Sequence, residues 1–228
     1  MAVIVVHGAG SAGVAARSLL EGWLAQESDV VLLEDRSGDV ERVIAALDRH
    51  VDSLHRRPLT VAGVSMGAHA VARWAARRPS AAAALVLALP AWRGAPSVVA
   101  AATRASAEQV SALGAPAALD HARASAPADA AFAMSLLALG WDAYEPGTLA
   151  PALHAAALGH GPTDADLRRV PTPCVVAGWT GDALHPESEA RAWAAGIPGA
   201  NLVLVPWAEA NSDPQAFGWA VSAALASA

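Results

Sequence analysis

Six short runs of apolar residues recur along the chain, and most of them are continuously apolar instead of alternating with polar positions. Such runs are typical of strands that are covered on both faces in a parallel sheet. The pattern therefore predicts strands at Val3–Val6, Val30–Leu33, Leu59–Ala62, Leu85–Leu89, Cys174–Ala177 and Leu202–Val205.

Segments with helical periodicity lie between and after these runs. In Met66–Arg78, for example, Val71 and Trp74 recur at helical spacing, and Pro79 ends the segment. Strands that alternate with helices indicate an α/β fold with a mostly parallel, doubly wound sheet, here of about six strands. The other predicted helices are Ala15–Gln26, Val40–Leu54, Glu187–Ala195 and Ala216–Ala226.

A long segment between the fourth and fifth runs breaks this rhythm. From Ala91 to about Val170 the chain is rich in Ala, Pro and Ser, and it contains no run typical of a strand. It also carries large apolar residues such as Phe132 and Trp141, which argue against a flexible linker. We therefore expect a core made of residues 1–90 and 171–228 and a helical insertion, residues 91–170, packed over one end of the sheet.

The composition narrows the class of protein. The chain has 228 residues, of which 54% are hydrophobic and 16% are charged, and this excludes a disordered protein. A net charge of −6 makes nucleic acid an unfavourable partner. All 15 basic residues are Arg, so lysine Schiff-base chemistry and the lysine of a phosphate-binding Walker loop are excluded.

Neither a metal site nor a membrane segment is indicated. The single cysteine, Cys174, cannot form an internal disulfide or a Cys-rich zinc site, and the eight histidines form no metal-binding motif. The first apolar run has no basic leader, and the Ala/Leu-rich stretch at 130–139 is too short to span a membrane. We expect a cytoplasmic protein with no metal, no cofactor and no membrane partner.

The turn after the first run is rich in glycine. Gly8, Gly10 and Gly13 form a G-x-G-x-x-G pattern between a predicted strand and a predicted helix, and Glu34 and Asp35 end the next run. This is the pattern of a dinucleotide-binding turn with its ribose-binding acid. Taken alone, the turn leaves a dinucleotide-binding protein open.

A second glycine motif favours different chemistry. Gly63-Val64-Ser65-Met66-Gly67 is a G-x-S-x-G pattern between a predicted strand and a predicted helix, the arrangement of a nucleophile elbow. Such a turn holds its serine in a strained backbone conformation, with the hydroxyl exposed and a helix N-terminus behind it. We expect close approach of strand and helix to require glycine at positions 63 and 67.

Four motifs, in sequence order, resemble those of the α/β-hydrolase family over nearly the whole chain. His7-Gly8-Ala9-Gly10 is similar to the oxyanion loop of that family, residues 34–38 to the loop after its next strand, and residues 63–67 to its elbow. Residues 181–186, Gly-Asp-Ala-Leu-His-Pro, resemble the loop that carries the acid of the catalytic triad. The resemblance implies a reduced form of that fold, without its first two antiparallel strands, in which the insertion takes the place of the lid.

The resemblance also implies roles for individual residues. Ser65 corresponds to the nucleophile of a serine hydrolase and Asp182 to the acid. The backbone N–H groups of Ala9 and Met66 correspond to the oxyanion hole. The implied activity is hydrolysis of an ester, thioester or amide of a small apolar molecule, so the expected partner is a small-molecule substrate. The sequence does not set the oligomeric state.

The sequence departs from the family at the histidine of the triad. That histidine follows the last strand of the family, where it would fall near Ala210, and this chain has no histidine after His185. The resemblance places His185 beside the site, in contact with substrate, instead of in the triad.

Three interpretations of this departure stay open. Ala210 stands where a histidine has been replaced, or the protein lacks a base and uses its pocket as a lyase, a cyclase or a ligand-binding protein. In the third interpretation another histidine is the base, and those considered are His69, His154, His160 and His185.

Tryptophan is unusually frequent, with eight residues against one tyrosine and two phenylalanines. Trp92, Trp179 and Trp207 each follow the end of a predicted strand, where loops surround the crevice of an open α/β sheet. We therefore expect these three side chains to form an aromatic wall for an apolar or flat substrate. The other residues expected to contact substrate are His7, Gly8 and His185.

Overall fold

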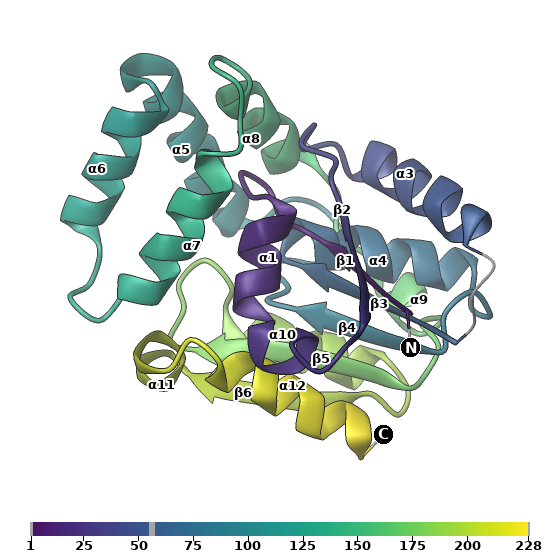
Figure 1. Ribbon diagram of the computed structural model, residues 1–228. Helices are drawn as coiled ribbons and strands as arrows, with labels where there is room; N and C mark the ends of the chain where they lie inside the picture. The colour runs from purple at the N-terminus through teal and green to yellow at the C-terminus, as the bar shows by residue number, and fades with distance from the viewer. Residues whose placement is uncertain (1, 55–57, 228) are drawn as a thin grey trace.

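The computed structural model describes residues 2–54 and 58–227, and within them six strands form one sheet in the order β2-β1-β3-β4-β5-β6 (Figure 1). All neighbouring strands are parallel. Each predicted run lies in one of these strands, except that Leu89 follows β4, so the predicted α/β fold is confirmed. The strands are β1 (Ala2–Val6), β2 (Asp29–Leu33), β3 (Leu59–Val64), β4 (Ala84–Ala88), β5 (Cys174–Thr180) and β6 (Asn201–Pro206).

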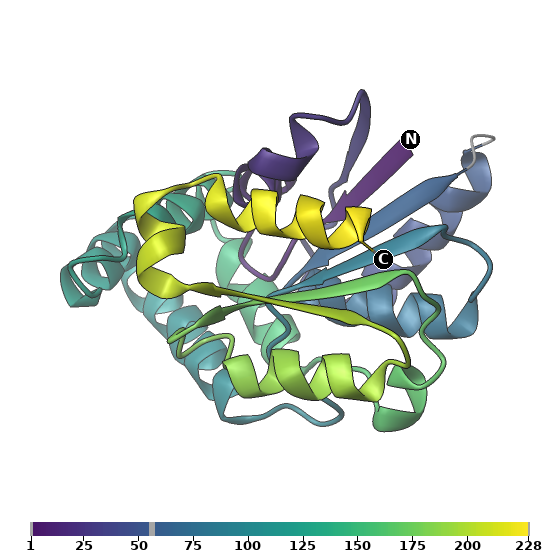
Figure 2. The ribbon, with the colours of Figure 1, turned by 90° about the horizontal axis from the view of Figure 1, so that it is seen from below.

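Helices cover both faces of the sheet (Figure 2). Residues of the central strands are therefore buried whichever face their side chains point to, which explains why β1 and β3 are continuously apolar or small. One layer contains α3 (Val40–Ser53), α4 (Met66–Arg77) and α10 (Glu187–Gly196), and the other contains α1 (Gly13–Leu19), α2 (Glu21–Leu24) and α12 (Ala216–Ala226).

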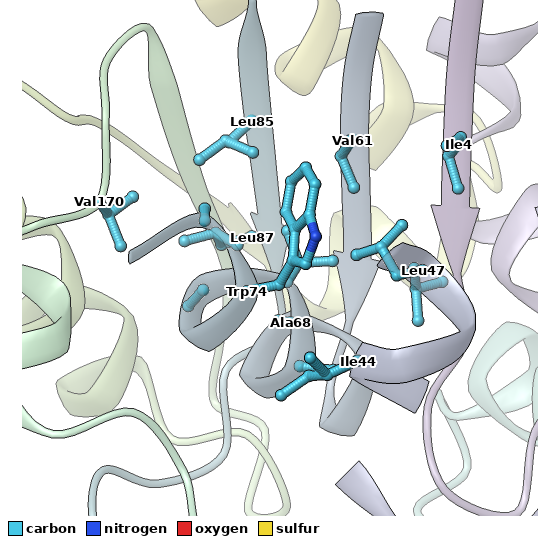
Figure 3. Packing of buried hydrophobic residues seen from close by; sticks show 14 of the residues in the cluster. Ile4, Ile44, Leu47, Val61, Ala68, Trp74, Leu85, Leu87 and Val170 are labelled. Carbon is cyan, nitrogen blue, oxygen red and sulfur yellow. The ribbon is translucent and has the colours of Figure 1, made fainter. Parts of the chain in front are cut away.

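The core between the sheet and the first layer surrounds Trp74 of α4 (Figure 3). Ile4 and Val61 reach this core from neighbouring strands, and Leu47 reaches it from α3. The Trp74 indole N–H donates a hydrogen bond to Asp48 Oδ1 at 2.8 Å, so the ring is buried with its donor satisfied. This packing fixes the helix that follows the G-x-S-x-G motif.

The predicted helix Ala15–Gln26 is divided into α1 and α2 at Leu20. Gly22 of α2 packs directly on the backbone of α12, and a Cβ on Gly22 would lie 2.4 Å from the carbonyl oxygen of Gln215. The change of direction at Leu20 thus allows α2 to pack against α12 instead of continuing along the axis of α1.

Residues 91–170 are helical, as predicted, and contain no strand. Four of their helices gather at the end of the sheet where the strands end (Figure 1), and their apolar side chains form a small core that includes Leu119, Trp141 and Leu153. Nowhere in the described residues is a helix both long enough and apolar enough to cross a membrane. The helices of the insertion are α5 (Val98–Leu113), α6 (Ala115–Ser125), α7 (Ala131–Trp141), α8 (Leu149–Leu158) and the short α9 (Asp164–Leu167).

The order of the strands opens a crevice beside β1. The chain leaves β1 for β2 on one side and returns to β3 on the other side, so the loops that follow β1 and β3 diverge at the carboxyl ends of these strands. Open α/β sheets bind ligands at such a switch point. The loop of residues 7–12 follows β1 and Ser65 follows β3, so the fold brings both motifs to this place.

Candidate active site

Ser65 lies in the sharp turn between β3 and α4. Its backbone has φ 55° and ψ −118°, a strained conformation for a residue with a side chain, and its N–H donates to the carbonyl oxygen of Ala88 at 2.9 Å. A Cβ on Gly63 would lie 2.3 Å from the oxygen of Gly67, and one on Gly67 would lie 2.3 Å from the oxygen of Val6. The predicted strain and the predicted need for glycine are both confirmed.

Replacing Gly67 by alanine is expected to lower the free energy of unfolding by roughly 3 kcal/mol or more, because the new methyl group meets backbone atoms of β1 that cannot move aside. Gly94 is the matched control, since it has φ +61° but no atom within 4 Å of an added Cβ. Gly94→Ala is expected to cost only about 1–2 kcal/mol of backbone strain. Urea unfolding measures both, and equal losses would contradict the steric explanation.

The loop after β5 carries both other members of a hydrogen-bonded chain that ends at Ser65. Asp182 Oδ1 accepts the backbone N–H of Leu184 at 2.8 Å, which curls the loop back on itself. His185 Nδ1 lies 2.8 Å from Asp182 Oδ2, and His185 Nε2 lies 3.0 Å from Ser65 Oγ. The imidazole therefore bridges the carboxylate and the hydroxyl.

The electrostatics of Asp182 set the tautomer of that imidazole. Burial would raise the pKa of the Asp182 carboxyl, but hydrogen bonds from His185 and Leu184 outweigh burial and hold its pKa below the usual value. An ionised carboxylate only accepts, so Nδ1 of His185 carries the proton. The lone pair on Nε2 then accepts the Ser65 hydroxyl proton, which is the arrangement of a general base beside a nucleophile.

The structure places the histidine differently from the expectation at position 210. Ala210 belongs to α11 (Trp207–Ser212), a helix that starts directly after β6 and was not predicted. Its side chain is fully buried in the apolar cluster around Phe217, and it does not line the pocket that contains Ser65. The bridging position of His185 likewise corrects the expectation that it lies beside the site, because the curled loop turns its ring onto Ser65.

Two other histidines are held inside the protein. His7 is buried, its Nδ1 donates to the carbonyl oxygen of Gly8 at 2.8 Å, and it is not among the residues that line the pocket. His69 Nε2 accepts backbone N–H groups of Ala91 and Trp92 at 3.3 and 3.4 Å. Burial lowers the pKa of His69 to about 3, so this ring is a neutral, structural acceptor.

The loop after β1 passes directly over Ser65. A Cβ on Gly8 would lie 3.1 Å from Ser65 Cβ and 3.6 Å from its Oγ, so a side chain at this position would crowd Ser65. Ala9 and Met66 line the same pocket as Ser65, and Met66 is the first residue of α4. The first N–H groups of a helix have no acceptor within the helix, so this end of α4 favours negative charge.

The G-x-G-x-x-G pattern of this loop has different surroundings from those of a dinucleotide-binding site. Glu34 Oε1 accepts the backbone N–H of Gly13 at 2.9 Å, and Arg36 pairs with Oε2 of the same carboxylate at 3.0 Å. Leu153 and Trp141 of the insertion lie on Gly10, where a Cβ would be 2.7 Å from Leu153 Cδ2. The acid thus supports α1, and apolar side chains occupy the place of a pyrophosphate.

A pocket of about 270 Å³ lies above Ser65. Trp92, Trp179 and Trp207 all line it, and the rings of Trp179 and Trp207 meet edge to face with centroids 5.3 Å apart. Apart from Asp182 and His185, its lining residues are uncharged, and among the described residues no group of three or more His, Cys, Asp or Glu side chains is placed to hold a metal. The lining residues from the insertion that the sequence did not single out for the site include Val99, Thr103, Ser106, Leu137, Trp141 and Leu153.

Comparison with known proteins agrees with this architecture. No protein-family model and no curated protein sequence matches the chain, but solved structures do. An acetylester hydrolase from Corynebacterium glutamicum is similar at a TM-score of 0.74 and 14% identity, over 98% of this chain and 84% of that one. A thermophilic esterase from Thermogutta terrifontis is similar at 0.69 and 20% identity, over 100% and 90% of the two chains.

A bromoperoxidase from Bacillus anthracis is similar at a TM-score of 0.73 and 16% identity, over 98% of this chain and 90% of that one. Identities of this size establish the fold alone. The parallel sheet, its flanking helices and this likeness show together that the chain has the α/β-hydrolase fold.

Proposed function

We propose that the chain is a serine hydrolase that cleaves an ester of a small, apolar, uncharged molecule. The observation that supports this most strongly is the chain of hydrogen bonds from Ser65 through His185 to Asp182, at 3.0 and 2.8 Å. It opens into a pocket with no other charged lining residue, which disfavours a charged substrate. Similar folds in an acetylester hydrolase and an esterase favour esters over the thioesters and amides that the same chemistry cleaves.

In the first half of the proposed reaction the enzyme is acylated. Ser65 Oγ attacks the carbonyl carbon of the ester while its proton passes to His185 Nε2. The imidazolium that forms is stabilised by Asp182, which keeps its negative charge. The C–O bond to the alcohol then breaks, the alcohol oxygen takes the proton from Nε2, and the acyl group stays on Ser65.

The negative charge of the tetrahedral intermediate needs donors on the opposite side from the histidine. The backbone N–H groups of Ala9 and Met66 are proposed to supply them, since both residues line the pocket beside Ser65. In the second half of the reaction a water molecule gives its proton to His185 Nε2 and attacks the acyl carbon. The acid leaves as the proton returns to Ser65 Oγ.

The insertion is proposed to act as the roof of this site. Its residues Leu137, Trp141 and Leu153 line the pocket opposite the sheet. A lyase, a cyclase or a ligand-binding protein was an alternative because the sequence offered no base at the expected position. His185 removes that reason, because it lies within hydrogen-bonding distance of Ser65.

A fluorophosphonate probe tests the proposal, because it reacts with serine only where a base activates the hydroxyl. The wild type is expected to be labelled at Ser65, located by peptide mass spectrometry, and to hydrolyse 4-nitrophenyl butyrate. Ser65→Ala is expected to lose both. Ser106→Ala is the matched control, since Ser106 lines the same pocket and should leave both unchanged. Labelling elsewhere, or hydrolysis by Ser65→Ala, would sink the proposal.

A further inference from the structure

Trp141 closes the pocket on the side of the insertion. Its side chain is 5% exposed and packs in the small core of the insertion with Leu149 and Leu153. Its indole nitrogen lies over Gly10, 3.2 Å from the position of a Cβ on that residue. The ring is therefore part of the wall that faces Ser65.

This wall is held in place by a close backbone contact. A Cβ on Gly140 would lie 2.7 Å from the carbonyl oxygen of Gly10 and 2.8 Å from Ser11 Cα, so α7 rests directly on the loop after β1. The backbone N–H of Tyr144 donates to the carbonyl oxygen of Trp141 at 3.1 Å and closes the turn behind it. A longer substrate thus cannot displace Trp141 by a small shift of α7.

A second pocket, of about 250 Å³, lies at the surface of the insertion and is also lined by Trp141. It is between α6 and α7, which are neighbours in Figure 1. Among residues 2–54 and 58–227, Trp141 alone lines both cavities, while Leu119, Asp120, Arg123 and Asp142 line only the second. The first cavity is mostly apolar and the second is partly charged, so Trp141 borders two different environments.

We propose that Trp141 is a partition that limits the substrate to esters with a short apolar chain, and that its removal joins the two cavities. This inference rests on the proposed function and adds the size class of its substrate. The first cavity alone is smaller than the roughly 300–1,000 Å³ typical of sites for drug-sized ligands. A chain that outgrows it then meets the Trp141 side chain.

The test compares 4-nitrophenyl esters of straight-chain acids from two to twelve carbons. For the wild type, kcat/KM is expected to rise with chain length and then fall by at least tenfold for the longest chains. In Trp141→Ala the ratio of kcat/KM for the decanoyl ester to that for the butyryl ester is expected to rise about tenfold or more, since each buried methylene is worth up to about fourfold. Trp141→Phe, which keeps a smaller ring, should shift the ratio less.

Leu137→Ala is the matched control, because Leu137 lies one turn earlier on α7 and lines only the first cavity. It enlarges that cavity without opening the second and is expected to leave the decanoyl-to-butyryl ratio within about twofold of the wild type. A ratio in Trp141→Ala that equals the wild-type ratio, or an equal rise in Leu137→Ala, overturns the partition.

Binding of straight-chain primary alcohols, measured by calorimetry, tests the length of the pocket without any hydrolysis. Cooperative thermal unfolding of each protein first shows that it is folded. Affinity is expected to stop rising at a shorter chain in the wild type than in Trp141→Ala. The same plateau in both proteins overturns the partition, even if no ester is cleaved. Absence of ester hydrolysis together with the expected binding series would overturn only the proposed function.

Discussion

Replacing His185 by alanine is expected to lower kcat for an activated ester by roughly 10⁵- to 10⁶-fold, the loss seen when a serine hydrolase is deprived of its base. His185 Nε2 lies 3.0 Å from Ser65 Oγ and is proposed to accept its proton, and without that acceptor the hydroxyl is a weak nucleophile. Steady-state kinetics with 4-nitrophenyl butyrate measure the loss. His185 is partly exposed, so the thermal unfolding temperature should change little.

The decisive control restores a histidine at the position that the family resemblance favoured. Ala210→His, made in the His185→Ala background, is expected to recover no activity, because residue 210 does not line the pocket. Ala210 is fully buried among apolar side chains, so the imidazole should also destabilise the fold. Recovery of esterase activity in this double variant would mean that the base belongs after β6 and not on the loop after β5.

Acid is expected to destabilise the protein well before its carboxylates are neutralised, because of His69. Burial, with smaller contributions from His185 and Arg73, lowers the pKa of His69 to about 3 in the folded protein. The unfolded chain has the ordinary value of 6.5. Between these values only the unfolded chain binds the proton. The free energy of unfolding therefore keeps its full value above pH 6.5, and it decreases as the pH falls from 6.5 towards 3.

The expected loss is up to about 1.4 kcal/mol for each pH unit below 6.5, and about 4 kcal/mol by pH 3. Urea unfolding at pH 7, 6, 5 and 4 measures it. His69→Gln keeps an oxygen that accepts the N–H groups of Ala91 and Trp92 but does not titrate there. This variant should be less stable at pH 7 and show a shallower decline in acid. A decline as steep as that of the wild type would contradict the role of His69.

Burial also lowers the pKa of His7, so some decline is expected to persist in His69→Gln. The two rings differ in their surroundings. His7 Nε2 lies 3.6 Å from Glu34 Oε2, whose charge favours the charged form of His7, whereas the charges near His69, on His185 and Arg73, disfavour its charged form. His69 should therefore account for the larger share.

The strands and the nucleophile turn were predictable because their signals are local. A strand buried on both faces needs apolar residues at nearly every position, so a short apolar run is enough to predict β1, β4 and β5. The turn at Ser65 needs glycine on both sides because backbones touch there. Neither inference requires knowledge of what lies far away in the sequence.

The position of the proposed base, His185, was not predictable in the same way. His185 reaches Ser65 because Gly181 adopts φ +86° and the Asp182 side chain caps the N–H of Leu184, which turns a histidine three residues later back onto its own acid. The one available signal was the spacing of acid and histidine within a single short loop. The pocket wall from the insertion depends on how α7 and α8 pack on the loop after β1, and no local pattern encodes this.

The acid and the histidine lie within one loop of six residues, 181–186, between β5 and α10. The loop that carries both proposed members of the proton relay is therefore anchored at one end by β5 and at the other by α10. The two members move together when that loop moves, so their mutual distance is insulated from shifts elsewhere. The C-terminal segment from β6 to the end of α12 therefore contributes Trp207 to the pocket lining but no member of this hydrogen-bonded chain.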